Sequence, residues 1–131
     1  WTVFPLCYCF PAHDVSQRTW VSQTRQSCPQ TCALLESILG DTLRTALYSQ
    51  LQPQTTLEAH TGWADLANSV LRLHIPLVVP DSDNNGGGGN GLCGTWVDGC
   101  VETHQVGRPL LFDDSKIHRA FNYSQHSSRI V

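Results

Sequence analysis

The sequence predicts a mainly β fold, either a sandwich or a jelly roll, built as a single domain over residues 1–131. The chain of 131 residues is too short for two independent cores. Its composition, 40% hydrophobic and 15% charged, is typical of a packed globular protein. One capped helical segment is followed by many short apolar segments separated by turn residues, which favours strands arranged in antiparallel sheets.

The first third of the chain predicts one strand and one helix. Trp1–Phe10 mixes aromatic residues and cysteines without a helical period, so we expect an extended segment. The mostly polar residues 12–28 favour a loop. Thr31–Leu39 is predicted to be a helix, because Pro29 stands near its start and Gly40 directly after its end.

The remainder of the chain predicts strands. Apolar segments at 47–51 and 70–79 are typical of strands, and the Gly-rich and Asn-rich residues 81–91 predict a flexible loop inserted between strands. Further short strands are expected at 95–97, 110–112 and 120–121, and from Arg129 onward. Because this last strand begins so close to Val131, we expect the domain to be partial, with its C-terminal strands truncated.

Charge and composition exclude several classes of function. The net charge is −3 and the basic residues are scattered, which argues against nucleic-acid binding. No apolar run approaches the roughly 18 to 20 residues of a membrane span, so we expect no membrane segment in this chain. Six cysteines and the sequon at Asn122 favour an oxidising compartment, and a bridge between Cys93 and Cys100 is one of fifteen possible pairings.

Histidines supply the candidate chemistry. Taken singly, each of the six is more typical of a surface or core residue than of a ligand. Three have neighbours that make a ligand role more plausible: His60 stands beside turn residues, His74 inside an apolar segment, and His118 after an acidic turn. Two imidazoles on separate strands of a jelly roll, with a later arginine, are the arrangement of non-haem Fe(II) oxygenases. In that arrangement the arginine pairs with a carboxylate of an oxoacid co-substrate.

Several segments, in order, resemble the catalytic domain of the aspartyl/asparaginyl β-hydroxylase family. They are Tyr48-Ser49, His60-Thr61-Gly62, Leu71-Arg72-Leu73-His74, Gly107–His118 with its FDDSxxH element, and Arg129-Ile130-Val131. The resemblance spans nearly the whole chain. It implies a double-stranded β-helix that uses Fe(II), 2-oxoglutarate and O2 to hydroxylate an unactivated C–H bond, with decarboxylation of 2-oxoglutarate to succinate.

The resemblance also implies a metal centre. His60 and His118 match the two metal ligands, which are the catalytic centre of the family. Gly62 stands where the wider superfamily places an acidic ligand, which this family lacks, so water fills that coordination position. Asp113 and Asp114 either orient His118 from behind or face the substrate, and the alternative for both is a cap of the turn.

Five residues match the family's co-substrate site. Ser49 matches a hydrogen-bonding position, Arg72 and His74 match an Arg-x-His pair that contacts 2-oxoglutarate, and Arg129 matches the partner of its distal carboxylate. Trp1 matches an aromatic residue that lines the pocket. A buried dianion needs cationic and hydroxyl partners, although Arg72 could instead be an exposed charge on an edge strand.

Departures from the family pattern bear on the substrate. Val70 and Leu47 stand where the animal enzymes carry an arginine and a lysine. The leading hypothesis is hydroxylation of the β-carbon of a peptidyl Asp or Asn, in a disulfide-rich protein partner. The alternatives are the same chemistry on a fatty-acyl lipid and a non-catalytic secreted β-rich binding module. The family implies a location in the endoplasmic reticulum lumen or secretory pathway, on a membrane-anchored parent.

Overall fold

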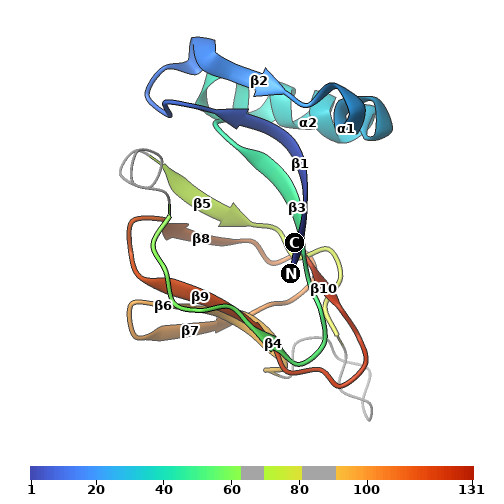
Figure 1. The fold of residues 1–131 in the computed structure, drawn as a ribbon, viewed down its shortest axis with the longest axis vertical. Helices are drawn as coiled ribbons and strands as arrows, with labels where there is room; N and C mark the ends of the chain where they lie inside the picture. Colours follow the sequence, from blue (N-terminus) through green and yellow to red (C-terminus); the bar gives the residue numbers. More distant parts are fainter. Residues whose placement is uncertain (63–69, 81–90) are drawn as a thin grey trace. The chain divides into compact units, whose positions relative to one another are not determined.

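The computed structural model describes residues 1–62, 70–80 and 91–131 and confirms a mainly β fold (Figure 1). It contains two compact units. Residues 3–48 form the helical unit, which holds both α-helices. Residues 1–2 and 49–131 form the strand unit.

The helical unit consists of short strands and helices in alternation. Its elements are β1 (Thr2–Cys9), η1 (Val15–Gln17), β2 (Arg18–Trp20), α1 (Ser22–Ser27), α2 (Pro29–Leu39), η2 (Gly40–Thr42) and the first residues of β3 (Ala46–Leu51). β1 and β2 pair antiparallel, with Cys7 opposite Trp20. Burial of alkyl and thiol groups forms the core of this unit and raises the pKa of the Cys7 and Cys32 thiols.

The predicted helix is confirmed, and the predicted loop before it is wrong in part. Pro29 opens α2, and Gly40 ends it at a positive φ of 46°, with its N–H donating to the carbonyl of Glu36. Residues 12–28 hold η1, β2 and α1 instead of a continuous loop. These elements are short and polar, and they depend on distant partners: the Thr24 hydroxyl, for example, donates to the carbonyl of Pro5.

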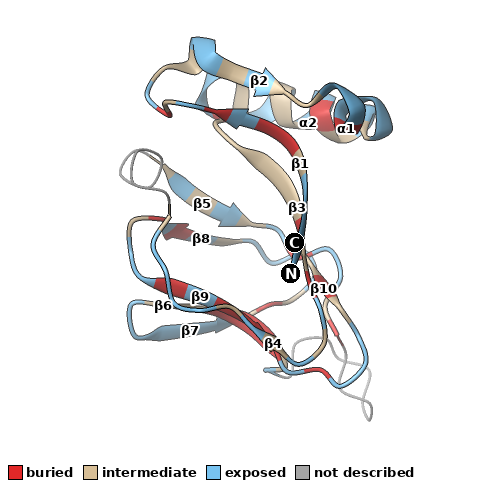
Figure 2. Cartoon of the chain, in the orientation of Figure 1, coloured by how far each residue is buried: buried red, intermediate tan, exposed pale blue. Residues whose placement is uncertain are grey.

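The strand unit contains an antiparallel sheet with the strand order β4-β9-β6-β7, and a separate pair, β5-β8 (Figure 1). The strands are β4 (Thr55–Thr56), β5 (Leu71–His74), β6 (Cys93–Val97), β7 (Cys100–Thr103), β8 (Leu110–Asp113), β9 (His118–Asn122) and β10 (Arg129–Ile130). β10 pairs with Gln50 and Leu51 at the end of β3. Buried residues follow β9 for most of its length (Figure 2).

The predicted strands are confirmed at 47–51, 95–97, 110–112, 120–121 and from Arg129. The segment predicted at 70–79 is shorter, because β5 ends at His74. Pro76, which lacks an N–H, follows closely, and only Val78 then makes an isolated bridge, to Ile130. β4 and β7 were not predicted. The predicted loop at 81–91 lies, except for its last residue, outside the described residues.

β5 has its polar side chains on its more buried face. Leu71 and Leu73 are 64% and 45% exposed, whereas the alternate residues Arg72 and His74 are partly buried. Arg72 lies opposite the buried Phe112 of β8 in the antiparallel register. Because side chains alternate between the faces of a strand, β5 turns its apolar residues outward and its cationic and imidazole groups inward.

The structure bears on the Cys93–Cys100 pairing, which is wrong in this fold, and on the sequon at Asn122. All six cysteines are free, and Cys100 lies opposite Val97, about 13 Å along β6 from Cys93. A disulfide needs Cα atoms within about 7 Å. Asn122 of the sequon is fully buried, and its Nδ2 donates to the carbonyls of Leu51, Gln52 and Ser127 at 3.0, 3.1 and 2.9 Å. Its amide therefore joins β9 to neighbouring segments and is not free to carry a glycan.

Candidate functional site

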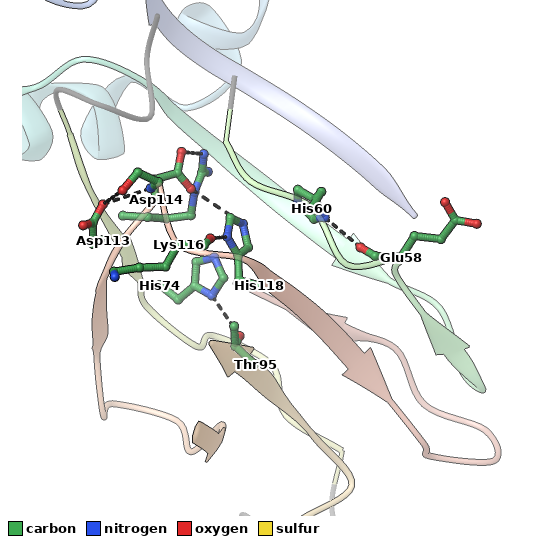
Figure 3. A network of polar contacts seen from close by, with 10 residues as sticks. Glu58, His60, His74, Thr95, Asp113, Asp114, Lys116 and His118 are labelled. Carbon is green, nitrogen blue, oxygen red and sulfur yellow. Dashed lines mark hydrogen bonds and ion pairs between the residues drawn. The ribbon is translucent and has the colours of Figure 1, made fainter. Parts of the chain in front are cut away.

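His60 and His118 lie side by side in the strand unit. They form an isolated antiparallel bridge, in which each backbone N–H donates to the other's carbonyl, at 2.9 and 2.8 Å. Their imidazole centroids are 4.5 Å apart and the rings are inclined at 59° (Figure 3). The bridge brings together two side chains that are 58 positions apart in the sequence.

The two rings are oriented in the same way. His60 Nδ1 lies 2.8 Å from the carbonyl of Glu58, and His118 Nδ1 lies 2.7 Å from the carbonyl of Lys116. A carbonyl only accepts, so each Nδ1 carries the proton, and each Nε2 is left with a lone pair in the neutral ring. Burial lowers the pKa of His118, which favours that neutral form. Two Nε2 atoms on rings whose Nδ1 atoms are fixed by hydrogen bonds are a donor set that suits a divalent transition metal.

Asp114 lies on the Nε2 side of His118, in a buried ion pair. Its carboxylate is fully buried and accepts two hydrogen bonds from Arg72, from Nε to Oδ1 and from Nη2 to Oδ2 at 2.7 Å. Oδ1 also lies 3.6 Å from His118 Nε2 (Figure 3). The guanidinium of Arg72 is therefore engaged by Asp114, and the two together form a fixed charged wall beside the imidazole pair.

Asp113 has a local role in the turn. Its Oδ1 accepts from the backbone N–H and the hydroxyl of Ser115, at 2.9 and 2.7 Å. The hydrogen bond from the Ser115 hydroxyl lowers the pKa of the Asp113 carboxyl. These contacts are those of a turn cap, which is the alternative that the sequence left open for this residue.

Arg129, Ser49 and Trp1 converge at the pairing of β10 with β3. Trp1 Nε1 donates to Ser49 Oγ at 2.9 Å, and Arg129 Nη2 lies 3.5 Å from the same oxygen. Arg129 is 1% exposed, and its Nε and Nη1 have no hydrogen-bond partner among the described residues. Burial lowers the pKa of Arg129 only to about 10, so the side chain is charged at neutral pH. A buried guanidinium with two unpaired donors fits an anionic partner such as a carboxylate.

His74 belongs to a second group of polar side chains. Its Nδ1 lies 3.4 Å from the hydroxyl of Thr95, and its ring meets those of His104 and Phe112 edge-on. Burial, followed by the positive charge of Arg129, lowers the pKa of His74 well below its usual value. The structure therefore places His74 where the charge of Arg129 acts on it, as a shared anion site requires.

His104 is a buried member of this group that the sequence did not single out. It is 1% exposed, and its Nε2 lies 3.1 Å from the hydroxyl of Thr95. Its Nδ1 has no hydrogen-bond partner in the part of the chain that the structure describes, and burial lowers the pKa of His104 to about 4. The residue is one of six histidines, and it stands after β7, which was itself not predicted, so no pattern in the sequence distinguishes it.

Within residues 1–62, 70–80 and 91–131, no three His, Cys, Asp or Glu side chains are grouped to hold a metal ion. The predicted centre needs only the two imidazoles. An open groove of about 420 Å³ is lined by residues of β6 to β8, including Val97, Glu102 and Phe112, and none of the predicted site residues lines it. The helices of the described segments are too short or too polar to cross a bilayer.

Comparisons with known proteins show which family the chain is similar to. A family model described as "Aspartyl/Asparaginyl beta-hydroxylase" matches residues 1–131. The "Ornithine lipid ester-linked acyl 2-hydroxylase" of Rhizobium tropici is 37% identical over 109 residues, which are 83% of this chain and 34% of that protein. The "Aspartate beta-hydroxylase domain-containing protein 2" of Mus musculus is 33% identical over 82% of this chain and 29% of its own length. Its Homo sapiens counterpart is 32% identical over 86% of this chain and 28% of its own length. The chain thus spans about a third of these relatives.

Proposed function

Because this chain belongs to the aspartyl/asparaginyl β-hydroxylase family, we propose that it is the catalytic part of an Fe(II)- and 2-oxoglutarate-dependent dioxygenase. Both units then belong to one domain, a double-stranded β-helix. The observation that carries the proposal is the pairing of His60 with His118, in which hydrogen bonds at both Nδ1 atoms leave both Nε2 atoms as donors.

His60 and His118 would hold the iron through Nε2. When bound, iron and 2-oxoglutarate supply the oxidising power with which O2 hydroxylates a C–H bond, yielding succinate and CO2. The protein orients the two ligands through the carbonyls of Glu58 and Lys116. Asp114, paired with Arg72, lies beside His118 and would fix a charged wall next to the metal site.

Arg129 would pair with the distal carboxylate of 2-oxoglutarate. Its two unpaired N–H groups are available for this contact, and Ser49 and Trp1 extend the polar wall beside it. A buried cation without an anion is costly, so co-substrate binding at this arginine would also stabilise the fold. We assign His74 to the same site, because the charge of Arg129 acts on it.

The substrate proposed first is a peptidyl Asp or Asn side chain, hydroxylated at the β-carbon, in a disulfide-rich protein. The second candidate is a fatty-acyl chain of a lipid. It is supported by the Rhizobium tropici relative, which is named as a lipid acyl hydroxylase, and by the exposed Leu71, Leu73 and Leu111 on the outer face of β5-β8. The location in the endoplasmic reticulum lumen, on a membrane-anchored parent, stays a prediction.

Succinate formation tests the function. The chain is incubated with Fe(II), ascorbate and 2-oxoglutarate, and oxygen-dependent succinate is measured alone, with a disulfide-bonded peptide containing Asp and Asn, and with vesicles of an acyl-ornithine lipid. We expect turnover that is lost in His118→Ala and retained in His126→Ala, which changes an exposed histidine. If only the vesicles stimulate succinate formation, the lipid and not the peptide is the substrate. If succinate formation is unchanged in His118→Ala, the enzyme proposal fails and the binding-module alternative remains.

A further inference from the structure

Thr95 connects two histidines through one hydroxyl group. Its Oγ1 lies 3.1 Å from His104 Nε2 and 3.4 Å from His74 Nδ1. The three residues come from different segments, β6, the turn after β7 and the end of β5. A hydroxyl has one proton and two lone pairs. Among the described residues, Thr95 Oγ1 has no hydrogen-bond partner besides these two rings, and a buried hydroxyl proton without an acceptor is costly, so Thr95 donates to one ring and accepts from the other.

Both rings are neutral at pH 7, because burial lowers the pKa of His104 to about 4 and that of His74 well below its usual range. A neutral imidazole has one N–H and one lone pair. The protons of the two rings and of Thr95 are therefore coupled, and only two arrangements are compatible with both contacts.

In the first arrangement, His104 Nε2–H donates to Thr95, and Thr95 donates to His74 Nδ1. His74 then carries its proton on Nε2, and the unpaired Nδ1 of His104 is an acceptor. In the second arrangement, His74 Nδ1–H donates to Thr95 and Thr95 donates to His104 Nε2. The unpaired His104 Nδ1 would then be a buried donor, beside the donors that are already unpaired on Arg129.

The surroundings favour the first arrangement. The positive charge of Arg129 lowers the pKa of both rings. This charge therefore favours a lone pair, and not an N–H group, at the unpaired His104 Nδ1. A buried unpaired donor is also rarer in proteins than an acceptor with spare capacity. The second arrangement would leave three unpaired donors and no acceptor among these buried atoms.

We propose that His104 acts through Thr95 as a positioning residue, fixing His74 in the tautomer whose Nε2 carries the proton. This inference rests on the proposed function in one respect: the N–H of His74 would serve as a donor to a carboxylate of 2-oxoglutarate. An Nδ1-protonated His74 would instead present a lone pair to that anion and repel it.

Long-range ¹H–¹⁵N correlation spectra of the ¹⁵N-histidine-labelled chain, without metal or co-substrate, test the proposal. Single His→Gln variants assign the signals. We expect His74 and His104 to be protonated at Nε2 in the wild type and in Thr95→Ser, which keeps the hydroxyl. In Thr95→Val, His74 should lose this preference and populate both tautomers.

The affinity for 2-oxoglutarate, measured by calorimetry with Mn(II) present, gives the second readout. We expect Thr95→Val and His104→Leu to bind about tenfold more weakly, as for the loss of one hydrogen bond to a charged group, and Thr95→Ser to match the wild type within about twofold. A wild-type His74 protonated at Nδ1, or an unchanged tautomer in Thr95→Val, would overturn the inference. The wild-type spectrum decides even if the valine variant fails to fold. A chain that shows the expected tautomers but binds no 2-oxoglutarate would overturn the proposed function instead.

Discussion

The two compact units differ in what they bury. The helical unit buries small apolar and thiol side chains, namely Leu6, Cys7, Cys9, Ala12, Cys32 and Leu43, and among its described residues Thr24 is the only buried polar one. The strand unit buries apolar residues as well, but also Ser49, Thr95, His104, Asp114, His118, Asn122, Ser124 and Arg129.

This difference identifies where the chemistry lies. Burying a charge or an unpaired polar group costs free energy. A unit with no role besides stability would therefore bury mostly apolar side chains, as the helical unit does. The strand unit tolerates an arginine with two unpaired donors and a histidine with one unpaired nitrogen. Groups that reduce stability but are suited to bind an anion and a metal mark a functional site.

Breaking one ion pair in each unit should give the largest contrast. Arg72→Leu leaves the fully buried Asp114 carboxylate unpaired, and we expect the free energy of unfolding to fall by about 4 kcal/mol. Arg25→Leu removes the exposed pair with Glu36 and should cost less than about 1 kcal/mol. Urea denaturation of both variants measures the difference. Equal losses would show that burial of the Asp114 pair does not distinguish the units.

Removal of a buried polar side chain should give the next largest effect. Asn122→Ala deletes the amide that pairs with three backbone carbonyls, and we expect a loss of about 3 kcal/mol in the free energy of unfolding. Thr24→Val, the matched change in the helical unit, should cost about 1 kcal/mol. Mass spectrometry of protein from a glycosylating host should find Asn122 unmodified; a glycan there would contradict its burial.

Acid should weaken the strand unit by a smaller amount. The pKa of His104 is about 4 in the folded chain, below the 6.5 of a free histidine. Between these values the unfolded state binds more protons, so stability falls as the pH falls. From pH 7 to pH 5 this histidine should remove about 2 kcal/mol from the free energy of unfolding. His104→Gln should lose correspondingly less on acidification, whereas His13→Gln, at an exposed site of the helical unit, should follow the wild type. An identical loss in all three proteins would contradict this assignment.

The sequence predicted elements with local signals and missed those defined by their partners. The helix 29–39 was predictable because Pro29 and Gly40 mark its ends. β4 and β7 are short, and only their pairing with β9 and β6 makes them strands. The apolar residues of β5 indicated a strand, but they did not indicate that Arg72 and His74 take its more buried face. In a typical strand the apolar residues are buried, and β5 reverses this pattern.

The candidate site was predictable only through the family resemblance. No periodicity brings His60 to His118, since their bridge joins residues from distant parts of the chain. The resemblance singled out both, together with Arg129 and Ser49, which the structure places 3.5 Å apart. His104 was missed because its distinction is tertiary: burial, the contact with Thr95 and the charge of Arg129 are visible only in the folded chain.

Metal binding by the imidazole pair tests the central claim most directly. The chain is titrated with Mn(II) in the presence of 2-oxoglutarate, and free Mn(II) is measured from its electron paramagnetic resonance signal. We predict one ion bound per chain in the wild type and in His126→Ala, and loss of that ion in both His60→Ala and His118→Ala. Undiminished binding of one ion in His118→Ala, with the variant folded, would contradict the account.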